Sequence, residues 1–484
     1  MSLAYILILI GAALLIGLFR RARGWWMLAA SVLALYWLQP PTTIRYLDFW
    51  LPTATLGLSV LGWAVTAPAE TQKQPRTFAF DRNLLRDENL LAAAGVIALV
   101  LSIAGLRYID ALCCLTPNRP PVFGQVAVVL AVLSLGAFAL WRSRRPEAWL
   151  TAVTVLLLVL FAVLKSEPLG AWAAAGLRTL GGQDRALAAA AELRWLGFSF
   201  VAFRLIHTLR DRAAGRLPAL TLREYVTFAI FFPALPAGPL DRAQRFARDL
   251  HTPFTLGPDT VLSGGKRIVW GLFKKFALAD TLALIALSAA NAGQVQAAAW
   301  AWVLLYAYAL RIYLDFSGYT DVAIGTAQLM GVALPENFER PYLKSNLTAF
   351  WNSWHISLAQ WFRAYWFNPL TRTLRGSTRP ISLAAIIFSA QVTTMLLIGL
   401  WHGITWNFAI WGLWHGLGLF VHNRWSELLK GRTAAIDERP RLQRALAAVG
   451  TLLTFHYVTL GWVWFALPET GMALDMFAKL LMGK

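Results

Sequence analysis

The chain has 484 residues, of which 58% are apolar or aromatic and only 14% are charged, and its mean hydropathy is +0.54. This balance is more apolar than that of an ordinary soluble domain, so it argues against a soluble multi-domain enzyme. The formal net charge of +19 would suggest nucleic acid in a soluble protein. Here the bases fall in short loops between apolar runs, and no nucleic acid is needed to explain them.

Apolar runs follow one another along most of the chain and predict membrane helices. Arginines come after the first run, whereas a cleavable signal peptide carries its charge first, so residues 1–18 are expected to remain as a helix. The weaker segment 168–180 is expected to be half-inserted. We predict an all-α polytopic membrane protein with about 11–13 membrane helices. The expected membrane runs are residues 1–18, 25–38, 47–67, 89–106, 122–141, 147–164, 186–209, 221–238, 268–290, 296–314, 381–400, 404–423 and 446–467.

Positive charge alternates from loop to loop. One set of loops holds 13 bases, in residues 20–24, 70–88, 142–146 and 210–216. The loops between them hold seven bases over more residues, in 39–48, 107–121 and 165–194. Because cytoplasmic loops carry an excess of Lys and Arg, the first set is predicted to be cytoplasmic and the N-terminus to lie outside. The expected location is the cell inner membrane, with several crossings.

The only two cysteines, Cys113 and Cys114, are adjacent. Adjacent cysteines do not join separate elements, so neither a disulfide framework nor a thiolate metal site is expected. We interpret them as a buried or lipid-facing pair, with reversible lipidation near the membrane edge as the alternative.

Two later segments depart from plain membrane helices. Residues 232–239, FPALPAGP, place three prolines and a glycine inside an apolar run, which predicts a re-entrant segment buried in protein. Between 315 and 380, charges, prolines and tryptophans are interleaved, as is typical of segments that lie in or dip into the membrane interface. We predict one integral membrane domain over 1–484, with N-terminal scaffold helices in 1–210 and the functional core in 220–466.

Common catalytic templates are missing from the sequence. The segment SGGKR lacks the first glycine of a P-loop and has Arg267 where a hydroxyl would bind magnesium. The sequence contains no H-E-x-x-H, no G-x-S-x-G and no carboxylate–histidine spacing of a di-iron bundle. These absences argue against ATP hydrolysis, zinc proteolysis and serine hydrolysis, and no metal cofactor is expected.

His402 lies in the apolar and aromatic stretch LLIGLWHGITWNFAIWGLWHG. An ionisable side chain at membrane depth is costly and therefore indicates function, and histidine accepts a proton near neutral pH. The alternative is a neutral core histidine bonded to a backbone carbonyl, and position alone does not separate the two. Gly399 and Gly403 permit close approach of backbone or ligand, and Trp401 and Trp406 are expected to wall the pocket against water.

A second histidine, His355, lies in FWNSWHISLAQWF. If this segment is helical, Trp351, Trp354 and His355 occupy neighbouring positions. The alternative is an interfacial histidine that extends towards lipid headgroups. His415 and His422 share a helical face at i, i+7, and because no carboxylate joins them we interpret both as packing or interhelical hydrogen-bonding residues.

The segment LDFSGYTDVAIG contains two carboxylates, Asp315 and Asp321, near the end of a predicted helix. At i, i+6 they do not share one face, so paired acid/base chemistry is weakly supported. Helix capping or hydrogen bonding to a neighbouring segment is the favoured interpretation.

Five sequence blocks occur in a fixed order between residues 230 and 425. They are FPALPAGPLDR (232–242), WGLFKKFALAD (270–280), DFSGYTDVAIG (315–325), FWNSWHISLAQWFRAYWFNPL (350–370) and GLWHGITWNFAIWGLWHG (399–416). Together they resemble the membrane-bound O-acyltransferase family, most closely its bacterial branch of alginate O-acetylation and teichoic-acid D-alanyl transfer proteins. Upstream of residue 210 the resemblance is limited to hydropathy.

The resemblance implies that His402 is the catalytic histidine and that His355 is the second histidine of the site. It also implies re-entrant and interfacial helices around a central funnel. The candidate substrate-binding residues are Asn352, Trp351, Trp354, Trp401, Trp406, Asn407 and Asp321.

Two positions depart from the family's usual pattern. Ala364 follows Arg363 where an acidic residue is usual, and Ser353 precedes the Trp-His pair where an arginine is common. His415 echoes His402, but 13 residues correspond to about 220° of helix rotation, so it is expected to face elsewhere.

The implied reaction moves an acyl group, acetyl in the first instance, from a cytoplasmic thioester across the membrane to a hydroxyl, for cell-envelope or exopolysaccharide modification. The donor is acyl-CoA or an acyl-carrier thioester, no cofactor is needed, and the expected partners are membrane lipid and an extracytoplasmic acyltransferase or acceptor protein. Two alternatives remain: D-alanyl transfer from a carrier protein, and a transporter or flippase of a small polar or lipid-linked substrate. A non-catalytic scaffold would be indicated by loss of His402, which is present.

Overall fold

The computed structural model of the protein describes residues 2–19, 21–67, 87–110, 113–143, 146–378, 380–430 and 439–482. Within these residues the regular structure is helical, and β-pairing is limited to one isolated bridge between Phe338 and Trp354. Six described helices are long and apolar enough to cross a membrane: Leu47–Thr66, Glu88–Tyr108, Phe123–Trp141, Glu147–Lys165, Leu383–His402 and Pro440–Ala466. The other predicted runs form shorter or more polar helices. The protein is an all-α polytopic membrane protein, as the hydropathy predicts.

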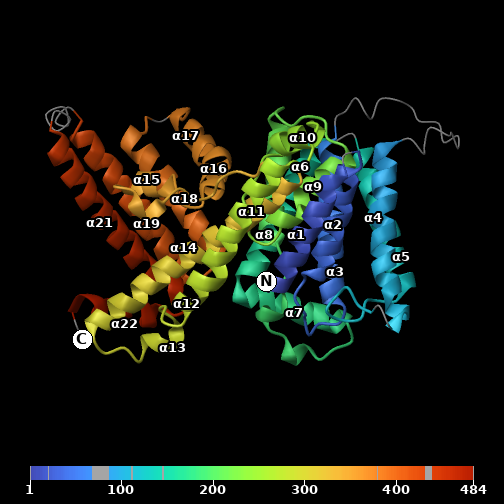
Figure 1. Ribbon diagram of the computed structural model, residues 1–484, viewed down its shortest axis with the longest axis horizontal. Coiled ribbons are helices and arrows are strands. Elements are labelled where there is room, and N and C mark those ends of the chain that lie inside the picture. Colours follow the sequence, from blue (N-terminus) through green and yellow to red (C-terminus); the bar gives the residue numbers. More distant parts are fainter. Residues whose placement is uncertain are drawn as a thin grey trace. The chain divides into compact units, whose positions relative to one another are not determined.

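The first of two compact units comprises Met1–Ile268 and Val322–Pro335. In this unit α2 packs on α9, and α3 packs on α5, α8 and α9 (Figure 1). Its helices are α1 (Leu3–Leu18), α2 (Arg23–Trp37), α3 (Leu47–Thr66), α4 (Glu88–Gly105), α5 (Phe123–Trp141), α6 (Pro146–Lys165), α7 (Glu167–Leu180), α8 (Phe198–Ala213), α9 (Leu222–Ile230), α10 (Ala243–His251) and most of α11 (Pro258–Leu272).

The proline-rich segment predicted to be re-entrant is a buried break after α9. It contains one short 3₁₀ turn, Phe232–Ala234, and all three residues of that turn are buried. The guanidinium of Arg204, on α8, donates to the carbonyl oxygens of Ala229 at 2.9 Å and Ala234 at 2.8 Å. Because buried carbonyl groups need hydrogen-bond partners, Arg204 makes this irregular backbone tolerable inside the protein.

The second unit comprises Val269–Asp321 and Glu336–Lys484. The sequence ranges 1–210 and 220–466 do not coincide with the two units, and the assignment of the functional core to 220–466 stays a prediction. The helical segments of the second unit are the π-helical η8 (Phe273–Ala279), α12 (Asp280–Ala283), α13 (Ala289–Ala292), most of α14 (Ala298–Leu329), α15 (Leu347–Trp351), α16 (Ile356–Phe362), the π-helical η10 (Arg363–Phe367), α17 (Asn368–Arg375), α18 (Leu383–His402), α19 (Trp406–Leu428), α21 (Pro440–Ala466) and α22 (Thr470–Met482).

Helices α18 and α19 form a tight hairpin and lie side by side (Figure 1). The Thr405 hydroxyl accepts from the backbone N–H of Phe408 at 3.4 Å and so caps the start of α19. A Cβ on Gly399 would overlap the carbonyl oxygen of Phe408, and one on Gly412 would lie 2.6 Å from the carbonyl oxygen of Met395. The two glycines therefore allow the backbones to approach closely, and this contact fixes the end of α18, where His402 lies.

The aromatic segment between 347 and 375 is broken into short helices, α15, α16, η10 and α17, and none of them is among the candidate membrane spans. This agrees with the prediction that the segment lacks a full crossing.

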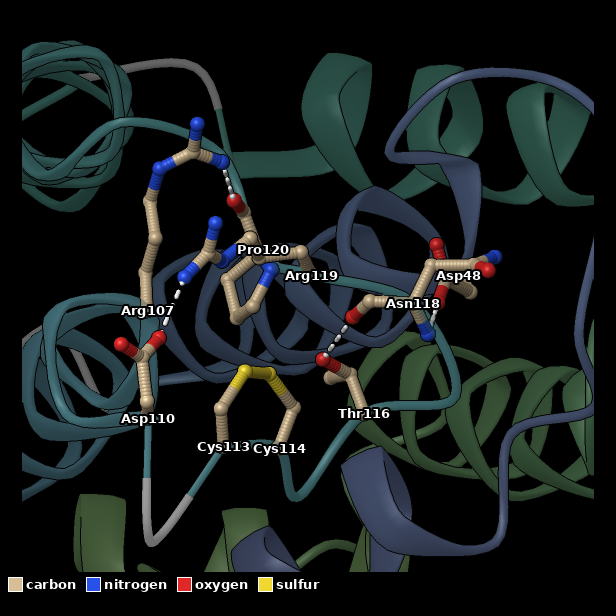
Figure 2. Close-up of a disulfide and its surroundings, with 9 residues drawn as sticks. All are labelled: Asp48, Arg107, Asp110, Cys113, Cys114, Thr116, Asn118, Arg119 and Pro120. Atoms are coloured by element: carbon tan, nitrogen blue, oxygen red, sulfur yellow. Dashed lines mark hydrogen bonds and ion pairs between the residues drawn. A yellow bond between two sulfur atoms is a disulfide. The ribbon is translucent and has the colours of Figure 1, made fainter.

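The two cysteines are joined to each other by a disulfide (Figure 2). They lie in the loop after α4, outside any helix. The same loop is attached to α3 because the backbone N–H of Asn118 donates to the Asp48 carboxylate at 2.8 Å. Both cysteine side chains are half-buried.

The predicted sidedness is testable on two described loops, since most of the basic loop 70–88 and part of 142–146 lie outside the described residues. Ala214, in the loop after α8, and Ala186, after α7, are both exposed. In intact cells of a variant lacking Cys113 and Cys114, a membrane-impermeant maleimide is expected to label Ala186→Cys and not Ala214→Cys. Both sites should react after the membrane is permeabilised. Labelling of Ala214→Cys in intact cells would reverse the predicted topology.

Candidate active site

His402 is the last residue of α18, and aromatic rings surround its half-buried imidazole. The ring centroids lie 4.5 Å from Trp401, 5.8 Å from Phe408 and 5.7 Å from Trp411. Phe465, on α21, packs edge-on at 4.7 Å. Three helices therefore position this imidazole, and their apolar rings limit water around it.

His355 is the N-cap residue of α16 and is 5% exposed. Its φ of 45° is in the left-handed region, which a non-glycine residue adopts only when the surrounding structure enforces it. Asn337 supplies that support: its carbonyl oxygen accepts from the N–H of Ile356 at 3.0 Å, and its Oδ1 accepts from the N–H of Ser357 at 3.1 Å. Strain of this kind is often found at functional sites.

Trp401 contacts both histidines predicted to be catalytic. Its ring centroid is 4.5 Å from that of His402 and 6.4 Å from that of His355. Phe316, on α14, packs edge-on against His355 at 4.7 Å. The structure thus brings the GLWHG and WHISL segments together around one indole.

The protonation state of His355 follows from its surroundings. Burial lowers the pKa of its imidazole to about 3, so the ring is neutral at physiological pH. The segment that carries it is not one of the candidate membrane spans.

Trp351 and Trp354 are buried in the aromatic core beside the site. Trp354 stacks on Phe350 at 5.7 Å and packs against Trp462 at 5.1 Å. Trp351 meets Trp411 edge-on at 5.7 Å. Their position makes both residues part of the wall behind the histidines.

The other candidate binding residues have different environments. Asn352 is exposed, and its Oδ1 accepts from Arg363 at 2.6 Å. Trp406 is 79% exposed. The buried amide of Asn407 is used at both ends, donating to the carbonyl of Leu467 and accepting from the hydroxyl of Thr470, each at 2.7 Å. Asn407 therefore ties α19 to the start of α22.

Asp321, on α14, forms an ion pair with Lys274 of η8, and Lys274 also donates to the hydroxyl of Ser317 at 3.3 Å. Its neighbour Lys275 pairs with Asp315. Both carboxylates of the DFSGYTD block thus bind lysines of the WGLFKKF block, which agrees with the interpretation that they bond to a neighbouring segment.

His415 lies closer to the site than the helix rotation suggests. Trp411 contacts both histidines, with centroids 5.7 Å from His402 and 5.0 Å from His415. His415 is fully buried, also against Trp351 at 5.0 Å. The rotation of 220° does not apply, because His402 ends α18 and His415 lies on α19, so the two residues are not on one continuous helix.

Five residues of the site were not singled out from the sequence: Phe316, Asn337, Phe408, Trp411 and Phe465. Trp411 and Phe465 lie in apolar helices where an aromatic residue predicts only packing. Asn337 stands in the polar segment PENFER next to Glu336, where nothing in the sequence distinguishes it from an ordinary loop residue. No cluster of three His, Cys, Asp or Glu side chains occurs within the described ranges.

Comparison with known proteins decides the family. The sequence profile of the membrane-bound O-acyltransferase family matches residues 124–440. The chain belongs to this family. The match includes both histidines and confirms the resemblance inferred from the five blocks. The matched region begins at residue 124, well upstream of the first block at 232–242. In those upstream helices the sequence had resembled the family only in hydropathy.

Named members of the membrane-bound O-acyltransferase family resemble this chain over much of its length. A protein named probable alginate O-acetylase AlgI from Azotobacter vinelandii is 33% identical over 355 residues, which are 72% of this chain and 65% of that protein. The teichoic acid D-alanyltransferase of Streptococcus thermophilus is 29% identical over 70% of this chain and 80% of its own length. The peptidoglycan O-acetyltransferase of Helicobacter pylori is 32% identical over 52% of this chain and 45% of its own length.

Proposed function

We propose that this protein transfers an acyl group, acetyl in the first instance, from a cytoplasmic thioester to a hydroxyl on the outer side of the cell inner membrane. The observation that carries the proposal is that His402 and His355 both contact the ring of Trp401, within the region that matches the family. A half-buried imidazole among apolar rings fits a base that works away from bulk water.

His402 acts as the general base. It takes the proton of the acceptor hydroxyl while the hydroxyl oxygen attacks the thioester carbonyl carbon, and a tetrahedral intermediate forms. The carbon–sulfur bond then breaks, the ester is released, and the leaving thiolate takes the proton from the imidazolium. One hydroxyl and one thioester become one ester and one thiol, so no metal or organic cofactor is needed.

The tetrahedral intermediate carries an oxyanion that needs hydrogen-bond donors. The Nε1 atom of Trp351 is buried and has no hydrogen-bond partner among the described residues. Its indole N–H is therefore a candidate donor, because a buried N–H gains most from a substrate oxygen.

The rings around His402 favour a small acyl group. Trp401, Phe408, Trp411 and Phe465 present apolar surface that suits a methyl group and excludes water that would hydrolyse the thioester. Aromatic faces also attract ammonium groups, and so D-alanyl is the competing acyl group. Relatives with both kinds of name occur among the matches.

Closed vesicles containing the purified protein test the reaction and its direction. Radiolabelled acetyl-CoA is placed on one face and a polysaccharide on the other, with and without an extracytoplasmic protein fraction. We expect labelled ester on the polysaccharide with acetyl-CoA on the cytoplasmic face, and only when the extracytoplasmic fraction supplies the accepting protein. A carrier-bound D-alanyl thioester is run in parallel, and transfer from it alone would make the protein a D-alanyltransferase. Uptake of label without ester formation would favour transport.

A further inference from the structure

Asn337 binds the beginning of α16 through one side-chain oxygen. This Oδ1 accepts from the N–H of Ser357 at 3.1 Å and from its hydroxyl at 2.9 Å, and it lies 3.2 Å from Nδ1 of His355. Asn337 and His355 are both buried, at 0% and 5% exposure. The three groups thus meet at one atom away from bulk water.

The identity of that atom can be established from its neighbours. A backbone N–H only donates, so the atom of Asn337 that faces the N–H of Ser357 has to be the amide oxygen and not the amide nitrogen. The Nδ1 of His355 faces the same oxygen. Two lone pairs would repel at 3.2 Å, and therefore Nδ1 carries the hydrogen.

A neutral imidazole has one N–H and one bare nitrogen. With the hydrogen on Nδ1, the Nε2 of His355 has an unshared lone pair and accepts hydrogen bonds without donating them. This Nε2 atom is buried and has no hydrogen-bond partner among the described residues. A buried acceptor of this kind requires a donor when the site is complete.

We propose that Asn337 is a positioning residue that holds His355 in the Nδ1–H form, so that Nε2 receives a hydrogen bond from a second hydroxyl of the acceptor, since the proton of the reacting hydroxyl goes to His402. This inference rests on the proposed acyl transfer. In this form His355 does not stabilise the oxyanion, because a bare nitrogen repels a negatively charged oxygen. An amide N–H of the thioester donor can make the same hydrogen bond to Nε2 as the acceptor does. Measuring KM separately for the donor and for the acceptor shows which substrate makes the bond.

Three variants test the positioning role. Asn337→Leu keeps the branched shape of the side chain and lacks the acceptor, whereas Asn337→Asp keeps an acceptor for Nδ1–H. The matched control is Asn423→Leu, whose amide oxygen accepts from the hydroxyl of Thr348 at 3.5 Å. We expect Asn337→Leu to lower kcat/KM for the acceptor by about 10–100-fold, the range seen when an orienting partner of a histidine is removed, with the donor KM unchanged. Asn337→Asp should recover most of the activity.

The Asn337→Asp variant also changes the pH profile. A carboxylate beside Nδ1–H stabilises the imidazolium and raises the pKa of His355. Activity that needs a bare Nε2 should therefore be lost, as the pH is lowered, at a higher pH than in the wild type. An unchanged profile, or activity equal to the wild type in Asn337→Leu, would overturn the proposal. A rise confined to the donor KM would assign the Nε2 contact to the donor and overturn the acceptor assignment.

The tautomer can be read without turnover. The chain has seven histidines, so ¹⁵N-histidine NMR of the full protein in lipid gives few signals, and His355→Gln identifies the pair that belongs to His355. We expect a protonated Nδ1 and a bare Nε2 in the wild type. A protonated Nε2 would refute the tautomer assignment even if acyl transfer is confirmed. Absence of acyl transfer would refute the proposed function but leave the tautomer assignment unaffected. This measurement holds even if Asn337→Leu does not fold.

Discussion

His402→Ala is expected to reduce acyl transfer by about 10²–10⁴-fold, the usual contribution of a positioned general base, while folded protein is recovered near the wild-type level. The hydroxyl nucleophile would keep its proton. Phe408 and Phe465, which pack against His402, have no titrating group and so do not replace the base. The half-buried position of His402, at the end of a helix, makes a large loss of stability unexpected. Transfer of labelled acetyl groups in membranes measures the effect.

Two further variants separate catalysis from packing. His402→Gln keeps most of the volume and hydrogen-bonding ability of the imidazole but is not a base, so it should be as inactive as His402→Ala. His456→Ala removes another half-buried histidine, whose Nε2 lies 2.9 Å from the hydroxyl of Tyr306, and should retain activity. Detergent-extracted monodispersity serves as the folding control. Full activity in well-folded His402→Gln would remove the main support for the enzyme and favour a transporter.

Much of the fold was predictable because hydropathy and helix signals are local. The α18–α19 hairpin illustrates this: an apolar run ends at His402, Gly403 breaks it, and Thr405 caps the next helix. The broken segment at 232–239 was also visible from its prolines. Its stabilisation by Arg204 was not, since a basic residue inside an apolar run does not reveal which carbonyl groups it binds.

The site was predictable only in part, since its contacts join distant segments. The resemblance to a family singled out His355 and His402, but nothing local shows that both contact Trp401. Asn337 lies 18 residues before His355 and reaches it through a left-handed turn that no periodic pattern predicts. The bonding of Cys113 to Cys114 is likewise absent from the sequence signal, because adjacency is compatible with free thiols.

A large stability effect is expected from the ion pair between Lys274 and Asp321, whose side chains are 11% and 15% exposed. Lys274→Met or Asp321→Leu leaves one charge without its partner in a mostly buried place. We expect each to lower the free energy of unfolding by about 3–5 kcal/mol, the usual cost of breaking a buried pair. Denaturant titration in detergent, followed by tryptophan fluorescence, measures the change.

The adjacent lysine gives a matched control. Lys275 pairs with Asp315, whose side chain is 48% exposed, so Lys275→Met should cost only about 0–1 kcal/mol. Equal free energies of unfolding for Lys274→Met and Lys275→Met would show that burial of the Lys274–Asp321 pair does not increase the cost of breaking it.

The double variant Lys274→Met/Asp321→Leu decides between structural and substrate-binding roles for Asp321. Removing both charges leaves no uncompensated group, and apolar replacements of a buried pair are often neutral, so the double variant should be more stable than either single variant. If it is stable and active, the carboxylate serves to hold η8 against α14. If it is stable and inactive, with a raised KM for one substrate, Asp321 binds that substrate and the lysine holds its carboxylate in place. Because both single variants lose stability under either role, only the double variant separates them.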